Sequence, residues 1–331
     1  MKNRVYLFLL YTLSILFIGV QKAAAQVAFS AANSRLEIGL NMGPMNFLGD
    51  LGGNKGKGTI GPKDNNIPVT NVIIGISASY YPSEWLGFRV AGNFGKMEGD
   101  DRLVKQNKPA DTYEGARKYR DLNFRSPLYE GYAAVEFFPT ALISLSNGWG
   151  LPRFRPYVLG GVGYFAFKPQ GLYRAPNGTE TWVDLQPLRT EGQGFPETGV
   201  QNYQLSSYSI PLGIGIKYDI TERITFGIEL IHRMTGTDYI DDVSGRYIDP
   251  ALFDKYLPAP QAAIAKTMAN PSTFYPSNTP GYTPYRPGRP RGNTGRRDSY
   301  FSSTFRLTWK IGDVYADWFK NKNSMRCPQY F

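Results

Sequence analysis

The stretch of sequence that decides the fold is YSIPLGIGIKYDITERITFGIELIHRM, residues 208–234. Apolar side chains occupy every second position from Ile210 to Tyr218, and the same alternation resumes at Ile224. A period of two indicates β-strands with one apolar and one polar face, whereas an α-helix repeats every 3.6 residues. The turn 219–223 between the two runs therefore predicts an antiparallel hairpin.

Six further runs of the chain have the strand pattern. In the first of them, Leu36, Ile38 and Leu40 share one face, while glutamate, glycine and asparagine occupy the other. The run FRPYVLGGVGYFAF is too rich in glycine and apolar residues for its faces to be assigned from sequence. The eight predicted strands are 35–47, 69–81, 86–96, 127–138, 154–167, 205–218, 224–234 and 299–311.

The connections between these strands alternate in length. Those at 48–68, 97–126, 168–204 and 235–298 are long, and the other three are short or intermediate. Outer-membrane barrels have short periplasmic turns and long external loops, and strands can cross lipid only as a closed barrel. The sequence predicts an all-β fold, an eight-stranded antiparallel transmembrane β-barrel with both termini in the periplasm. The alternative is a soluble β-sandwich whose charged residues face water.

The N-terminus has the layout of a secretory signal peptide. Lys2 and Arg4 precede an apolar run, and three alanines end it before Gln26. We expect a signal peptide at 1–25, the barrel at 26–311 and a periplasmic C-terminal tail at 312–331, in the cell outer membrane. An uncleaved membrane anchor is the alternative for the first segment. The single cysteine, Cys327, lies far from this segment, which argues against a lipid anchor at the mature N-terminus.

The polar faces of the predicted strands carry charges of both signs in nearly equal number. An eight-stranded barrel has an interior just wide enough for its own side chains, so these charges should pair inside it and leave no water-filled channel. The predicted interior charges are Glu37, Arg89, Glu130, Glu136, Lys217, Glu229, Arg233, Arg306 and Lys310.

The residues that catalysis requires are scarce. The chain has one histidine, His232. This count argues against Ser-His-Asp and Cys-His catalytic sites and against zinc sites built from several histidines. Its glycine runs lie within strands, where close packing of strands explains them better than a dinucleotide site. We expect no enzyme, no catalytic residue, no cofactor and no bound metal. The same scarcity argues against a lipid-modifying barrel enzyme.

The last long connection begins with the acidic stretch TDYIDDVSGRYID, residues 237–249. We expect its aspartates to face water and its tyrosines to lie at the membrane interface. Four aspartates could also ligate calcium, although their spacing is not that of an EF-hand loop. Two short helices are expected around 250–270. The candidate loop motif comprises Asp238, Tyr239, Asp241, Asp242, Ser244 and Gly245.

A stretch rich in proline, tyrosine and arginine, residues 271–297, follows in the same connection. It predicts an extended segment. Nucleic acid is not expected as its ligand, because an exported chain does not meet it routinely. A solvated loop is the simplest interpretation, with lipopolysaccharide phosphates or a protein as alternative targets. Its five arginines are Arg286, Arg289, Arg291, Arg296 and Arg297.

Several of these segments carry a family resemblance. LEIGLNMGPMNFLGDL, the hairpin quoted above, TDYIDDVSGRYID and RGNTGRRDSYFSSTFRL together resemble the PorG-like outer-membrane barrels of Bacteroidota. The resemblance implies a structural, non-enzymatic component of the type IX protein secretion machinery, associated with a periplasmic ring of secretion proteins. Three long connections and the tail depart from the family, which leaves open a paralogue with another partner.

The tail has a composition that suits a protein interface. Aromatic and basic residues lie close together in GDVYADWFKNKNSMRCPQYF. We expect outer-membrane lipid, lipopolysaccharide and periplasmic ring proteins as partners. The alternative is a general outer-membrane barrel whose long external loops bind a surface ligand. The candidate partner-binding residues of the tail are Trp318, Phe319, Lys320 and Arg326.

Overall fold

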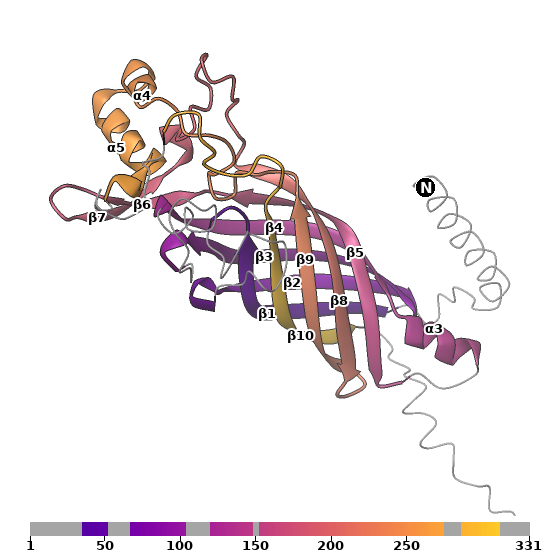
Figure 1. The fold of residues 1–331 in the computed structure, drawn as a ribbon. Coiled ribbons are helices and arrows are strands. Elements are labelled where there is room, and N and C mark those ends of the chain that lie inside the picture. Colours follow the sequence, from indigo (N-terminus) through magenta and orange to yellow (C-terminus); the bar gives the residue numbers. More distant parts are fainter. Residues whose placement is uncertain (1–34, 52–66, 104–119, 148–151, 275–285, 312–331) are drawn as a thin grey trace, which may run out of the picture.

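The computed structural model describes residues 35–51, 67–103, 120–147, 152–274 and 286–311. Eight antiparallel strands form a closed ring in which each strand pairs with two neighbours, in the order β3-β2-β1-β10-β9-β8-β5-β4 and back to β3 (Figure 1). These strands are β1 (Arg35–Leu48), β2 (Asn71–Ser83), β3 (Leu86–Asp100), β4 (Asn123–Phe137), β5 (Phe154–Phe167), β8 (Ser206–Asp219), β9 (Ile224–Thr235) and β10 (Ser299–Ile311).

The predicted eight-stranded barrel is confirmed, and its strand bounds differ from prediction by a few residues. β10 matches its predicted range, whereas β4 begins at Asn123 instead of 127. The faces of β5, which cannot be assigned from sequence, are clear in the structure: Val158 and Val162 point outward, and Arg155 points inward. A Cβ atom at Gly161 would lie 2.1 Å from the Ala133 carbonyl oxygen, so this glycine permits close pairing of β5 with β4.

The outer wall of the barrel is apolar. Leu40, Ile214 and Val162 are exposed to 62%, 60% and 68%. Water would disfavour such a continuous surface, and lipid tails would not. Aromatic side chains border this band toward both ends, as in barrels that span a membrane; they are Phe94, Tyr129, Tyr164 and Tyr208 at one end and Tyr80, Phe88, Phe154, Tyr218 and Trp309 at the other. The protein is therefore an outer-membrane β-barrel.

The two ends of the barrel differ. The tight turns after β2 and β8 lie at the periplasmic end, together with helix α3 (Pro139–Ser146) (Figure 1). The opposite, external end carries the long connections. They contain α4 (Ala251–Tyr256), α5 (Ala259–Ala269), the hairpin β6 (Gln170–Arg174) and β7 (Glu180–Asp184), and the 3-10 helices Ile67–Val69, Asp101–Leu103, Gln186–Leu188 and Pro271–Phe274.

Helices α4 and α5 lie within the range where two short helices are predicted from sequence. The β6–β7 hairpin is missed by the sequence prediction, which treats 168–204 as a loop. In the described residues, no helix is long and apolar enough to cross a membrane. The predicted signal peptide and C-terminal tail lie outside the described residues.

Candidate functional site

The centre of the barrel lumen holds two arginines between two glutamates. Arg89 of β3 donates hydrogen bonds of 2.8 and 2.7 Å to Glu229 of β9 and also binds Glu136 of β4. Arg306 of β10 lies 3.1 Å from Glu136 and 3.3 Å from Glu229. β3 and β9 stand four places apart in the ring of eight, as do β10 and β4. The pairs Arg89–Glu229 and Arg306–Glu136 therefore cross the full width of the lumen.

A lysine completes this central layer. The Lys217 ammonium lies 3.1 Å from Glu37 and 3.3 Å from Glu136, and it contacts the Tyr81 hydroxyl. The Tyr157 hydroxyl donates to Glu229. Ions in a wall of apolar residues are stable only when they are paired and most of their hydrogen-bonding positions are used. All the ions of this layer are paired, and Arg306 Nε is the one buried polar atom among these side chains that has no hydrogen-bond partner.

A second layer lies nearer the external end. The Glu130 carboxylate accepts hydrogen bonds from Arg233 at 3.1 Å, Tyr300 at 2.9 Å and Asn93 at 2.8 Å. The same arginine donates to Ser302 at 2.6 Å. These side chains come from β4, β9, β10 and β3, and they join opposite walls at this level as well.

A third layer closes the periplasmic end. Asp219 lies 2.8 Å from both Arg155 and Lys310, and Glu84 lies 3.3 Å from Arg155 and also pairs with Arg35. Arg35, Glu84, Arg155 and Asp219 are absent from the interior set proposed from sequence. Arg155 lies on the strand whose faces were unassigned, and the two acids lie at turns, where a period of two no longer applies. With three cross-linked layers, the lumen is filled with paired side chains.

The acidic motif lies at the external end, in a region that we name the external cap: the described residues of 168–205 and 236–298. The expectation that its aspartates face water is wrong for Asp241 and Asp242, which are fully buried, whereas Asp249 is exposed. Asp241 accepts hydrogen bonds of 3.0 Å from the backbone amides of Leu51 and Val243. Asp242 accepts from the Tyr203 hydroxyl at 2.7 Å and from Thr190. The aspartates therefore join the connection after β9 to the connections after β1 and after β5.

Arg291 is a buried cation of the cap. Its guanidinium lies 3.1 Å from Glu191 and donates 2.6 Å to the Asp242 carbonyl oxygen. The Glu191 carboxylate also accepts from the amides of Ser244 and Gly245, at 3.1 and 2.8 Å. Arg291 is 3% exposed, so the expectation that all five arginines of this segment are solvated is wrong for it. Paired here, it holds the two connections together.

The motif tyrosines do not lie at the membrane interface, contrary to the expectation. Tyr239 stacks on Tyr203 with ring centroids 4.7 Å apart, and Tyr247 is buried. The Asp238 carboxylate accepts a hydrogen bond of 2.6 Å from Ser244. The cap also has an apolar core that continues into the outer end of the barrel; it includes Leu188, Phe195, Ile240, Val243, Phe253, Ala262, Ala265 and Met268.

Burial changes the acidity of the cap carboxylates. It raises the pKa of Asp238 to about 7, with Asp50 and Glu191 adding repulsion, and raises the pKa of Asp242 to about 6 although Arg291 opposes the shift. Burial and the neighbouring aspartates raise the pKa of Asp241 and of Asp298 well above the usual range. Among the described residues, no group of three or more acidic, histidine or cysteine side chains is arranged to hold a metal ion.

The remaining candidates lie elsewhere. His232 is on the outward, lipid-facing side of β9 and is half-buried. Asp249 accepts a hydrogen bond of 2.9 Å from the amide of Ala251, at the start of α4. The predicted partner-binding residues Trp318, Phe319, Lys320 and Arg326 and the single Cys327 lie outside the described residues.

Comparison with solved structures finds chains of low likeness to this one. The chain matches Ail of Yersinia pestis with 8% identity and a TM-score of 0.31, covering 84% of this chain and 97% of that one. Neisserial surface protein A matches with 9% identity and a TM-score of 0.32, covering 84% and 97%. OprG of Pseudomonas aeruginosa matches with 11% identity and a TM-score of 0.32, covering 84% and 96%. At these scores the likenesses add nothing to the strand pairing. No protein-family model matches the chain, and no curated protein matches its sequence.

Proposed function

We propose that the protein is a non-enzymatic anchoring component of a protein secretion machinery of the type IX class, and that it works at its two ends and not through its lumen. The observation that carries the proposal is the lumen, where Arg89–Glu229 and Arg306–Glu136 join opposite walls. A barrel filled in this way offers solutes no path. The secretion role itself rests on the resemblance of the quoted motifs to PorG-like barrels.

The periplasmic end offers a surface for a ring of secretion proteins. Helix α3 is the largest regular element among the described residues of that end, and its Ile143 is 54% exposed. The tail from residue 312 starts at the same end, because β10 runs from the external end to the periplasmic turn side. An exposed isoleucine on α3 and a tail sequence rich in aromatic and basic residues are both of a composition that protein interfaces use.

Co-purification of a periplasmic partner from cells tests this proposal. Ile143→Glu in α3 and deletion of residues 321–331 should each reduce recovery of the partner. Ala263→Glu on the external helix α5 is the matched control, since Ala263 is exposed on a helix at the other end. Deletion of 275–285 is a second external control that spares the buried Arg291. All variants should remain heat-modifiable on gels, which reports a folded barrel.

The second candidate function is that of a barrel whose external cap binds a surface ligand. One observation favours that candidate: Arg291, Glu191 and Asp242 fix the cap in one conformation. A fixed surface binds at lower entropic cost than a mobile loop does. Loss of the partner on external changes, with retention on periplasmic ones, would support it and overturn the anchoring role.

A further inference from the structure

The lipid-facing wall of the barrel contains a groove of about 950 Å³. It crosses the outer face of six neighbouring strands, from β9 through β10, β1, β2 and β3 to β4. Its floor is formed at one end by Gly92 and Gly131, which pair across β3 and β4. A Cβ atom at either glycine would meet nothing within 4 Å. These two glycines therefore do not serve strand packing; they leave a hollow where side chains would otherwise project into lipid.

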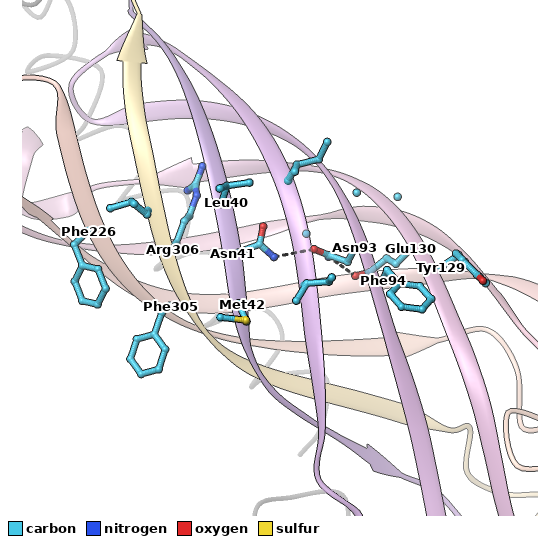
Figure 2. A pocket seen from close by; sticks show the side chains of 16 residues that line it. Leu40, Asn41, Met42, Asn93, Phe94, Tyr129, Glu130, Phe226, Phe305 and Arg306 are labelled. Atoms are coloured by element: carbon cyan, nitrogen blue, oxygen red, sulfur yellow. Dashed lines mark hydrogen bonds between the residues drawn. The ribbon is translucent and has the colours of Figure 1, made fainter.

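The groove is lined mainly by apolar side chains, and the polar lumen of the barrel lies behind it. Phe94 and Tyr129 lie two residues from the glycines on the same strands, toward the external end, with ring centroids 5.1 Å apart. Met42 and Phe305 line the other side (Figure 2). The hydrogen bonds from Asn41 to Asn93 and from Asn93 to Glu130, drawn in Figure 2, belong to the lumen side of the same wall. The groove is open to the bilayer and continuous with the lipid-facing band.

Three cations lie on the outer wall toward the external end from this groove. Lys96 is four residues beyond Gly92 on β3, which at the usual rise is roughly 13 Å. Arg125 is the outward residue of β4 at the same end, and the amide of Lys168 bonds Ser126 beside it. These positions correspond to the headgroup level of the outer leaflet, above the aromatic border.

Arg125 is partly buried and lies opposite Glu98 in the pairing of β3 with β4. Its guanidinium lies over the Trp182 ring at 4.2 Å, and its Nε donates to Gln170 at 3.0 Å. It forms no ion pair with a described residue. Lys96 pairs with Glu98 and Lys168 pairs with Asp184 at 2.6 Å, but both lysines are about half exposed. Exposed pairs of this kind are weak, so both lysines can turn to a phosphate.

We propose that this sector binds one phosphate-bearing lipid of the outer leaflet, with an acyl chain in the groove over Gly92 and Gly131 and the phosphate on Arg125, Lys96 and Lys168. Arginine fixed on an aromatic ring is suited to phosphate, which it binds through two parallel hydrogen bonds. The glycines admit a chain where larger side chains would exclude it. The bound lipid would tie the β6–β7 hairpin, through Trp182, to the membrane surface.

Native mass spectrometry of the full-length protein, released from nanodiscs that contain phosphatidylcholine and bisphosphorylated lipid A, tests this site. The wild-type protein should retain one lipid A. Arg125→Gln combined with Lys96→Gln should lower retention roughly tenfold or more, because charge-assisted hydrogen bonds are lost. Arg174→Gln is the matched control, because Arg174 lies on the same hairpin in an ion pair with Glu180. It should retain the lipid.

The groove is tested separately from the charges. Gly92→Leu with Gly131→Leu fills the hollow from two positions where a Cβ atom meets nothing within 4 Å and keeps the outer face apolar, so the barrel should insert and lose the lipid. Val162→Leu, on the lipid-facing side of β5 outside the groove, is its control. Dephosphorylated lipid A should not be retained by any variant. Equal retention by the filled and wild-type barrels, or of the dephosphorylated lipid, would overturn the proposal.

Discussion

The lumen and the external cap are two cores built on opposite plans. In the lumen, charged side chains meet at the axis and the apolar side chains point away into lipid, as for Arg89 inside and Val90 outside on β3. In the cap, Ile240 and Phe253 are buried and most charges face water. The medium around each region differs, since the outside of the barrel wall is hydrocarbon and the outside of the cap is water. The same chain therefore reverses its hydrophobic pattern where it leaves the membrane.

The boundary between the plans lies at the acidic motif. Five acidic or basic side chains are buried there beside the apolar core of the cap: Glu191, Asp241, Asp242, Arg291 and Asp298. They are satisfied mainly by backbone amides, carbonyl oxygens and hydroxyls of three separate segments. Charges in the lumen therefore cross-link strands, whereas charges in the cap fasten loops onto the rim of the barrel.

The largest expected effect follows from breaking the lumen network. Arg89→Met would leave Glu136 and Glu229 facing each other with reduced compensation, and it should lower the free energy of unfolding by about 3–5 kcal/mol. Urea unfolding in lipid vesicles, followed by tryptophan fluorescence, measures it. Arg289→Met, at an exposed arginine of the cap, should have almost no effect. Equal stability of the two variants would mean that the lumen charges do not hold the walls together.

A charge placed on the lipid side should have the next largest effect. Ile214→Arg should cost about 2–4 kcal/mol if the site lies near the bilayer midplane, whereas Ile311→Arg, at the periplasmic end of β10, should cost about 0–1 kcal/mol. Insertion into vesicles, read by heat-modifiable migration, distinguishes them. Similar insertion of both variants would contradict the assignment of the outer face.

One conservative change made in both regions sharpens the comparison. Ile240→Val opens space in the closed core of the cap and should cost about 0.5–1.5 kcal/mol. Ile214→Val is the same change on the lipid face, where mobile lipid tails fill the space, so its cost should be smaller. Unfolding measurements on the two variants decide the question. A larger cost at Ile214 would show that the wall is packed as tightly as the cap.

The last expected effect is on pH dependence, and it is measured in the cap. The pKa values of Asp238 and Asp242, about 7 and about 6, lie above the ordinary value near 3.9 for aspartate. Folding therefore favours the protonated forms, and their contribution to stability is complete below about pH 4 and is lost as the pH rises through 6 to 7. Amide exchange within 236–248, corrected for intrinsic rates, should be slower at pH 5 than at pH 8.

Asp238→Asn is the control for this effect, because it removes one titrating group and keeps an acceptor for Ser244. It should reduce the difference between pH 5 and pH 8. Greater protection of the wild-type cap at the higher pH would contradict the sign.

The barrel could be predicted from the sequence because a period of two is a local property. The alternation within a strand such as 299–311 predicts which of its residues share a face, and no other part of the chain is needed for this. The pairing of charges in the lumen could also be predicted, because charges on the inward faces of a narrow barrel have only one another as partners. Arg155 was missed because glycine and apolar residues hide the alternation of β5.

The cap could not be predicted in the same way. Whether Asp241 is buried depends on the amide of Leu51, which is 190 positions away in sequence, and the burial of Arg291 depends on Glu191. Acidic and arginine-rich stretches are usually solvated, and only long-range contacts make these exceptions. The β6–β7 hairpin was likewise hidden, because its two strands have five residues each and little alternation.

The central claim is that the protein acts at its ends and not as a pore, and the conductance of the purified full-length barrel in planar bilayers tests it most directly. With a water-filled porin as the positive control, the account predicts that insertion of the wild-type protein, verified by heat-modifiable migration of the same preparation, adds no stable ionic current to that of the bare bilayer. Reproducible open-channel steps from the wild-type protein would contradict the claim, because ions could then pass the cross-lumen pairs Arg89–Glu229 and Arg306–Glu136.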